Sequence, residues 1–208
     1  PPTPRRVTVR HYNLNITSTT LWQSCEPFGP TTVANGTLPG PTLRARAGEI
    51  LQIRVHNSLP PTETANGGNL TMHFHGLSMR MHPVMDGTMM VSQWPVRPGN
   101  FFDYRIPLTR EDKGTYLYHS HVGVQAMTAY GAVVVDDPEG EEFVDPGDAT
   151  VQAEKQPGSV QFVDVQGSVG LADDGRSSKR APYKYDEDRV LAVGDWFGYS
   201  SVSLVQQQ

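Results

Sequence analysis

The chain alternates between apolar and polar positions over several short stretches, with the period of two that is typical of half-buried β-strands. The alternation is clear in residues 5–16, and shorter strands are predicted over residues 50–55, 70–74, 101–106, 115–119 and 131–135. No stretch before residue 136 shows a long apolar repeat with the helical period, so helices should be minor. We therefore predict an all-β fold for residues 1–136, in the form of a Greek-key β-sandwich or barrel.

The composition changes after Val135. Residues 137–186 are rich in Asp, Glu, Gly, Ser and Pro, which predicts a linker or a long surface loop. The basic pair Lys179-Arg180 would suit a protease if it were exposed, or it is an ordinary solvated pair. The apolar run 189–193 then predicts a new strand, so we interpret residues 187–208 as the incomplete start of a second domain.

The composition and the net charge of the chain exclude some classes of binding partner. Of the 208 residues, 37% are hydrophobic and 19% are charged, which allows a sizeable buried core. The formal net charge of -5 argues against the basic face that nucleic-acid phosphates require. No apolar run approaches the roughly 18 residues of a membrane-spanning helix. We therefore predict neither a nucleic-acid partner nor a membrane partner.

Three N-glycosylation sequons, which begin at Asn15, Asn35 and Asn69, favour a secreted glycoprotein. No signal peptide is visible, but a mature secreted protein would look the same after cleavage. Cys25 is the single cysteine. It is therefore either a small buried hydrophobe or a residue that pairs with another chain.

Four of the seven histidines fall into two His-X-His units, His73-Phe74-His75 and His119-Ser120-His121. On a strand, residues i and i+2 project from the same face, so each pair can converge on one metal ion or serve two neighbouring ions. Neutral imidazole suits copper, zinc, iron and nickel. The spacing alone leaves zinc hydrolases open, because these enzymes also use histidine ligands and keep one position for water.

The residues around these units resemble the multicopper oxidase family. The segment from Met72 to Leu77 is similar to the first copper-binding motif of that family, and the segment from Tyr116 to His121 is similar to the second. The stretches 35–49, 86–99 and 125–135 also follow the family's order. The sequences of these motifs are most similar to those of fungal laccase-like enzymes, which include laccases, pigment-pathway oxidases and ascorbate-oxidase-like members. The resemblance implies a cupredoxin-like fold, with the start of a second cupredoxin domain after the linker.

The resemblance also implies a role for each matching residue. His73 would bind the type 2 copper, His75 and His119 one ion of the type 3 pair, and His121 the other ion. Together they would form half of the trinuclear cluster. Asp86 would be the catalytic acid that helps protons reach reduced oxygen, although an Asp-Gly turn is the plain alternative.

Other candidate ligands match no position of the family. His11, His56 and His82 are interpreted as ordinary histidines. The methionines between residues 79 and 90 could deliver Cu(I), but thioethers also fill irregular gaps, and we favour packing.

The chain departs from the family pattern in two places. The family's type 1 copper needs a His-Cys-His motif, and Cys25 has no neighbouring histidine. Trp94 stands where many laccases carry a cysteine that forms a disulfide. A tryptophan at this position is typical of the pigment-type members. The resemblance therefore implies that this chain is an amino-terminal portion, which shares its copper cluster with a second polypeptide. The second polypeptide would hold the type 1 copper. It would be either a cleavage product or a separate subunit.

We therefore expect part of a secreted laccase-like oxidase. The complete enzyme would oxidise phenolic or ascorbate-like donors by one electron each and reduce dioxygen to water. The alternative is a non-catalytic copper-binding cupredoxin interaction module. A ferroxidase would need acidic residues near the type 1 site, which this chain does not contain.

Overall fold

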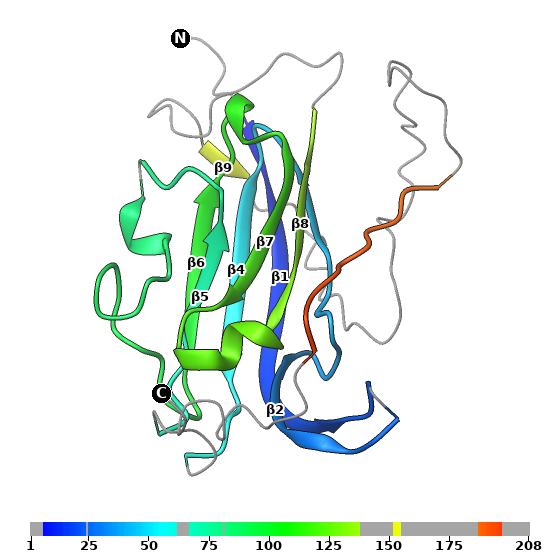
Figure 1. Ribbon diagram of the computed structural model, residues 1–208. Helices are drawn as coiled ribbons and strands as arrows, with labels where there is room; N and C mark the ends of the chain where they lie inside the picture. The colour runs from blue at the N-terminus through cyan, green and yellow to red at the C-terminus, as the bar shows by residue number, and fades with distance from the viewer. Residues whose placement is uncertain are drawn as a thin grey trace, which may run out of the picture.

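The computed structural model describes residues 6–23, 25–61, 67–80, 82–137, 152–154 and 187–196, which form two facing β-sheets (Figure 1). The first sheet has the strand order β2-β1-β4-β6, with β9 paired to β1. The second sheet has the order β3-β8-β7-β5. Strand bounds are β1 (Arg6–Leu21), β2 (Phe28–Ala34), β3 (Leu43–Arg46), β4 (Ile50–Asn57), β5 (Met72–His75), β6 (Phe101–Pro107), β7 (Gly114–Ser120), β8 (Tyr130–Asp136) and β9 (Gln152–Glu154).

Helical structure in the described residues is confined to short 3-10 turns. These are η1 (Pro83–Met85), η2 (Arg110–Asp112) and η3 (Gly123–Met127). None of them, and no other described helix, has the length and apolar character needed to cross a membrane. The prediction of an all-β chain with minor helices is thus confirmed.

The core lies between the two sheets and follows the period-two alternation of the sequence. In β4, Leu51, Ile53 and Val55 are buried, while the residues between them point outward. From the second sheet, Phe74 of β5 and Tyr118 of β7 are fully buried in the same cluster. Because neighbouring residues of a strand point to opposite faces, burying Phe74 and Tyr118 turns the adjacent histidines outward.

The six predicted strands correspond to β1, β4, β5, β6, β7 and β8. Two strands between β1 and β4 were not predicted. β2 contains Gly29 and Pro30, which usually interrupt strands, but its place at a sheet edge tolerates proline. β3 is only four residues long and follows a Pro-Gly-Pro turn, so its alternation is too short to stand out.

Within residues 137–186, for which the sequence predicts a linker or a long surface loop, the structure describes one short strand, β9. Residues 152–154 pair in parallel with Arg6, Val7 and Thr8 at the start of β1. No other described strand pairs with Arg6, Val7 and Thr8. Their backbone N–H and C=O groups are therefore available for hydrogen bonds with β9. The rest of the range, including Lys179-Arg180, lies outside the described residues apart from Asp137.

The predicted strand over residues 189–193 is extended but is paired with no other described strand. It is the orange segment in Figure 1. Asp188 forms an ion pair of 2.7 Å with Arg44 of β3, and the ring of Trp196 packs on Phe28 of β2. A second domain over residues 187–208 remains a prediction.

Candidate metal centre

The pairing of β5 with β7 brings the two His-X-His units together. In this antiparallel pair His73 lies directly opposite His119, and His75 lies opposite Leu117. His73 and His75 project from the same outward face of β5, as expected for residues i and i+2. His121 follows the end of β7, and its ring lies 5.6 Å from that of His73. All four imidazoles therefore gather at one end of the second sheet.

Three of these histidines place their donor atoms close enough for metal binding. One ring nitrogen from each of His73, His75 and His119 lies within 4.8 Å of the other two. The closest approach is 3.4 Å, between Nδ1 of His75 and Nε2 of His119. Two nitrogens on one ion, with metal–nitrogen bonds of about 2.0–2.1 Å, are at most about 4 Å apart. This pair therefore fits a single metal ion, and a neutral imidazole set suits copper.

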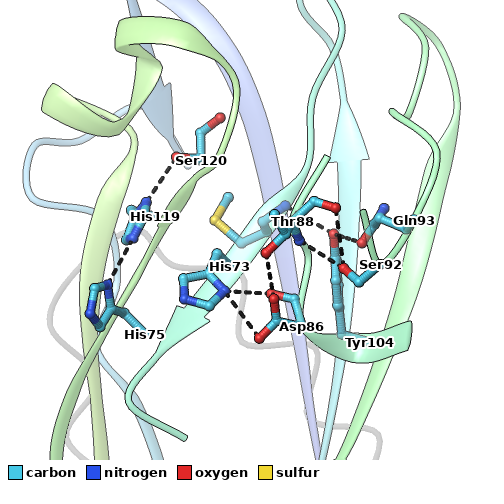
Figure 2. A network of polar contacts seen from close by, with 10 residues as sticks. His73, His75, Asp86, Thr88, Ser92, Gln93, Tyr104, His119 and Ser120 are labelled. Carbon is cyan, nitrogen blue, oxygen red and sulfur yellow. Dashed lines mark hydrogen bonds and ion pairs between the residues drawn. The ribbon is translucent and has the colours of Figure 1, made fainter. Parts of the chain in front are cut away.

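Backbone carbonyl groups decide which nitrogen of two histidines is free to bind. Nδ1 of His73 lies 2.6 Å from the carbonyl oxygen of Asp86, and Nδ1 of His119 lies 2.8 Å from that of Ser120 (Figure 2). A carbonyl oxygen can only accept a hydrogen bond, so both Nδ1 atoms carry the proton in the neutral ring. The Nε2 atoms are left with free lone pairs. This is the usual way in which a ligating histidine is oriented.

Burial lowers the pKa of His119 below its ordinary value. The hydrogen bond to Ser120 acts in the opposite direction, and the neighbouring His73, His75 and His121 lower the pKa further. A lowered pKa favours the neutral imidazole, and only the neutral ring has a lone pair for a metal. The cluster therefore disfavours protons at the atom that would bind the ion.

The loop after η1 carries Asp86 to the side of His73. Thr88 Oγ1 donates a hydrogen bond to Oδ2 of Asp86, while Oδ1 lies 3.6 Å from Nδ1 of His73. Gly87 has a φ of +80°, and a Cβ at this position would overlap the carbonyl oxygen of Met72. Position 87 thus requires glycine for two reasons, the positive φ of the backbone and the close approach of the loop to β5. Figure 2 shows Asp86 and Thr88 beside His73.

Two buried polar networks support the site, and no role was predicted for either. Ser120 donates a hydrogen bond of 2.6 Å to Gln125 Oε1, and Gln125 Nε2 donates one of 3.1 Å to the Asn69 carbonyl. Tyr104 donates to Gln93 Oε1 and accepts from the backbone N–H of Met72. Both networks hold a residue next to a histidine of the cluster. Ser120, Gln125 and Gln93 lie in stretches that resemble the family, but only the fold shows what they contact.

Several other candidate residues lie away from the cluster. His11 and His56 belong to the first sheet, and His82 is exposed. Cys25 is exposed, so it is not a buried small hydrophobe. Trp94 is also exposed, at 77%. Met79 and Met85 pack against the core, whereas Met90 is 63% exposed.

The chain is similar to known multicopper oxidases. The sequence profile described as multicopper oxidase matches residues 15–140. Laccase-like multicopper oxidase 1 of Thermothelomyces thermophilus is 37% identical over 174 residues, which cover 84% of this chain and 20% of that protein. Multicopper oxidase aurL2 of Gibberella zeae is 47% identical over 116 residues, which cover 56% and 18%. L-ascorbate oxidase of Cucumis sativus is 42% identical over 107 residues, which cover 51% and 17%.

Solved structures give the same result. The crystal structure of the laccase from Botrytis aclada superposes with a TM-score of 0.57 at 27% identity, over 64% of this chain and 23% of the laccase. The chain thus spans about a fifth of the length of its curated relatives. The cupredoxin-like fold is confirmed, and the family implies copper as the metal. This chain belongs to the multicopper oxidase family.

Proposed function

We propose that this chain supplies half of the trinuclear copper cluster of a secreted, laccase-like oxidase. The complete enzyme couples one-electron oxidation of phenolic or ascorbate-like donors to the reduction of dioxygen to water. The observation that carries the proposal is the outward-facing imidazole cluster, with His75 Nδ1 and His119 Nε2 only 3.4 Å apart. Copper, when bound, supplies the electron-transfer chemistry that side chains cannot.

The contacts of each histidine support a division of the ligands between ions. The short distance between His75 and His119 favours these two residues on one ion of the type 3 pair. His73 is held by the Asp86 carbonyl on the other side, so its Nε2 is assigned to the type 2 copper. His121, whose ring is 6.1 Å from that of His119, is assigned to the second type 3 ion.

Asp86 is placed to hold and transfer a proton beside the cluster. Its carboxylate accepts from Thr88 on one oxygen, and the other oxygen faces the ring of His73. A carboxyl group in such a position can pass a proton to the oxygen that is being reduced and take up another proton from the bulk solvent. The backbone carbonyl of Asp86 acts separately, by orienting His73.

The remaining ligands and the type 1 copper are proposed to come from a second polypeptide. His75 and His121 are exposed, as is Leu117, the residue of β7 opposite His75. A partner that covers this face would exclude water from the cluster and complete the coordination of each ion. The amino-acid sequence of the partner would show whether it is a cleavage product or a separate subunit.

The experiment is metal analysis and oxygen uptake on the protein as it is purified from its source, together with sequencing of any chain that co-purifies. We expect copper, oxygen consumption with a phenolic donor, and a larger second chain with a His-Cys-His motif. In the assembled protein, His119→Gln should abolish oxygen uptake and lower the copper content. His82→Gln is the control, because His82 is exposed and outside the cluster.

Stable zinc occupancy without oxidase activity would overturn the proposal. A single 22.9 kDa species that binds copper without turnover would instead identify a copper-binding module.

A further inference from the structure

The outward face of the first sheet carries a second arrangement of side chains, remote from the histidine cluster. Asn15 of β1 is paired with His56 of β4, and His56 is paired with Phe101 of β6. Paired residues of neighbouring strands point to the same face. The three side chains therefore form one row across the sheet, which we call the outer row.

Asn15 begins the outer row and has a side chain open to solvent. Its Oδ1 accepts a hydrogen bond of 2.7 Å from Ser58 Oγ, which fixes the orientation of the amide. Its Nδ2 donates to no atom of the described residues, and it begins the sequon Asn15-Ile16-Thr17. Asn35 differs, because its Nδ2 donates to the Asn13 carbonyl and its Oδ1 accepts from the Asn15 backbone.

Phe101 ends the outer row as an exposed aromatic ring with fixed neighbours. Its side chain is 51% exposed, although it lies in a strand. The guanidinium of Arg54 lies 4.3 Å from the ring centre, and two hydrogen bonds of 2.7 Å hold Arg54 to Asp103. The ring of His56 lies 5.7 Å away on the side toward Asn15. An exposed apolar ring beside cationic and imidazole donors suits a sugar, which has an apolar C–H face and a rim of hydroxyl groups.

We propose that Asn15 carries an N-linked glycan whose first two N-acetylglucosamine units lie across His56 and pack on Phe101. Two strand spacings of about 4.8 Å separate Asn15 from Phe101, a span that a disaccharide can cover. Packing of the C–H face on the ring removes apolar surface from water. Arg54 and His56 can bond to the sugar hydroxyls.

The inference rests on one part of the proposed function, entry into the secretory pathway. It does not depend on copper or on oxidase activity, so its failure and that of the oxidase proposal are separate results.

The test uses the full-length protein secreted from a eukaryotic host. Glycopeptide mass spectrometry should find Asn15 occupied, and Thr17→Val should remove this glycan while Thr17→Ser retains it. An endoglycosidase that cuts between the first two sugars should act slowly on the native protein at Asn15. Phe101→Ala should raise the rate of release about fivefold, the effect of losing one modest contact, and Phe101→Trp should preserve the wild-type rate.

Release at Asn69 in the same samples shows whether the substitution acts locally. A rate at Asn15 that Phe101→Ala leaves unchanged, or an equal rise at both sites, would overturn the inference. An unmodified Asn15 in the secreted protein would also overturn it.

Discussion

The carbonyl oxygens of Asp86 and Ser120 decide which ring nitrogen of His73 and His119 can bind a metal. Each carbonyl accepts a hydrogen bond from Nδ1 and leaves Nε2 free. His75 instead directs Nδ1 toward the cluster. The chemistry of the site thus depends on backbone atoms as much as on the histidines, and substitutions that move those backbone atoms should change metal binding without touching a ligand.

The stability of the metal-free chain should depend on pH through His119. The folded state lowers the pKa of this residue below 6.5, so the unfolded chain binds the proton more readily. The contribution to stability is therefore present above about pH 6.5 and is lost as the pH falls toward the folded-state pKa. Urea unfolding between about pH 8 and about pH 5 should show a larger loss of stability for the wild type than for His119→Gln.

Leu117→Ala provides the control, because Leu117 lies on the same face and does not titrate. This variant should keep the full pH dependence of the wild type. Equal pH dependence in the wild type and in His119→Gln would contradict the prediction.

Gly87 and Gly36 allow the effect of backbone conformation to be separated from that of close approach. Both have positive φ, at +80° and +73°, but only a Cβ on Gly87 would meet other atoms. Gly36→Ala should cost about 1–2 kcal/mol of unfolding free energy, from the left-handed conformation alone. Gly87→Ala should cost about 3 kcal/mol or more, because the loop must also move away from Met72. Urea unfolding measures both, and equal losses would contradict the argument.

At the scale of elements, the short turn η2 connects two loops that flank β5 and β7. Asp112, at the end of η2, is buried and accepts hydrogen bonds of 2.7 Å from both the backbone N–H and the hydroxyl of Thr109. Its other oxygen accepts from the backbone N–H of Ser78, in the loop after β5. The carboxylate therefore ties the end of β5 to the turn before β7, the two strands that carry the histidines.

Asp112→Ala should destabilise the fold by about 2–3 kcal/mol, since a cap is lost and donors are left without partners. Glu111→Ala, an exposed neighbour in the same turn, is the matched control and should change stability by less than about 0.5 kcal/mol. Chemical denaturation measures both variants. A loss for Glu111→Ala as large as that for Asp112→Ala would point to the turn as a whole rather than to the buried carboxylate.

At the scale of the whole molecule, the cluster lies on an outward face and not between the sheets. The face that carries His75 and His121 is open in the described residues. An ion bound there by this chain alone would keep contact with water and would have few ligands. Such an ion should exchange readily.

The separated chain should therefore retain almost no copper after dialysis against a weak chelator, whereas the assembled protein should keep its copper. Metal analysis of both samples tests this expectation, with circular dichroism to establish that the separated chain remains folded. Copper retained by the folded, separated chain at the level of the assembled protein would show that the site is complete without a partner.

The alternation of the sequence was sufficient to predict most strands and that the two histidines of each unit share a face. Residues i and i+2 share a face whatever the rest of the fold, so burial of Phe74 and Tyr118 turns both His-X-His units outward. The spacing alone was compatible with zinc as well as copper, and the surrounding motifs were needed to choose between them. β2 and β3 were missed because turn residues or shortness hid their alternation.

Only the tertiary structure decided which groups meet. Alternation specifies a face but not a neighbouring strand, so the pairing of His73 with His119 depends on the order β3-β8-β7-β5. The same holds for the carbonyl of Asp86, which reaches His73 through a loop that only Gly87 permits. The sequence by itself therefore determined the ligand types and their faces, because these follow from local periodicity. The fold decided distances, tautomers and exposure, because these depend on contacts between residues far apart in the chain.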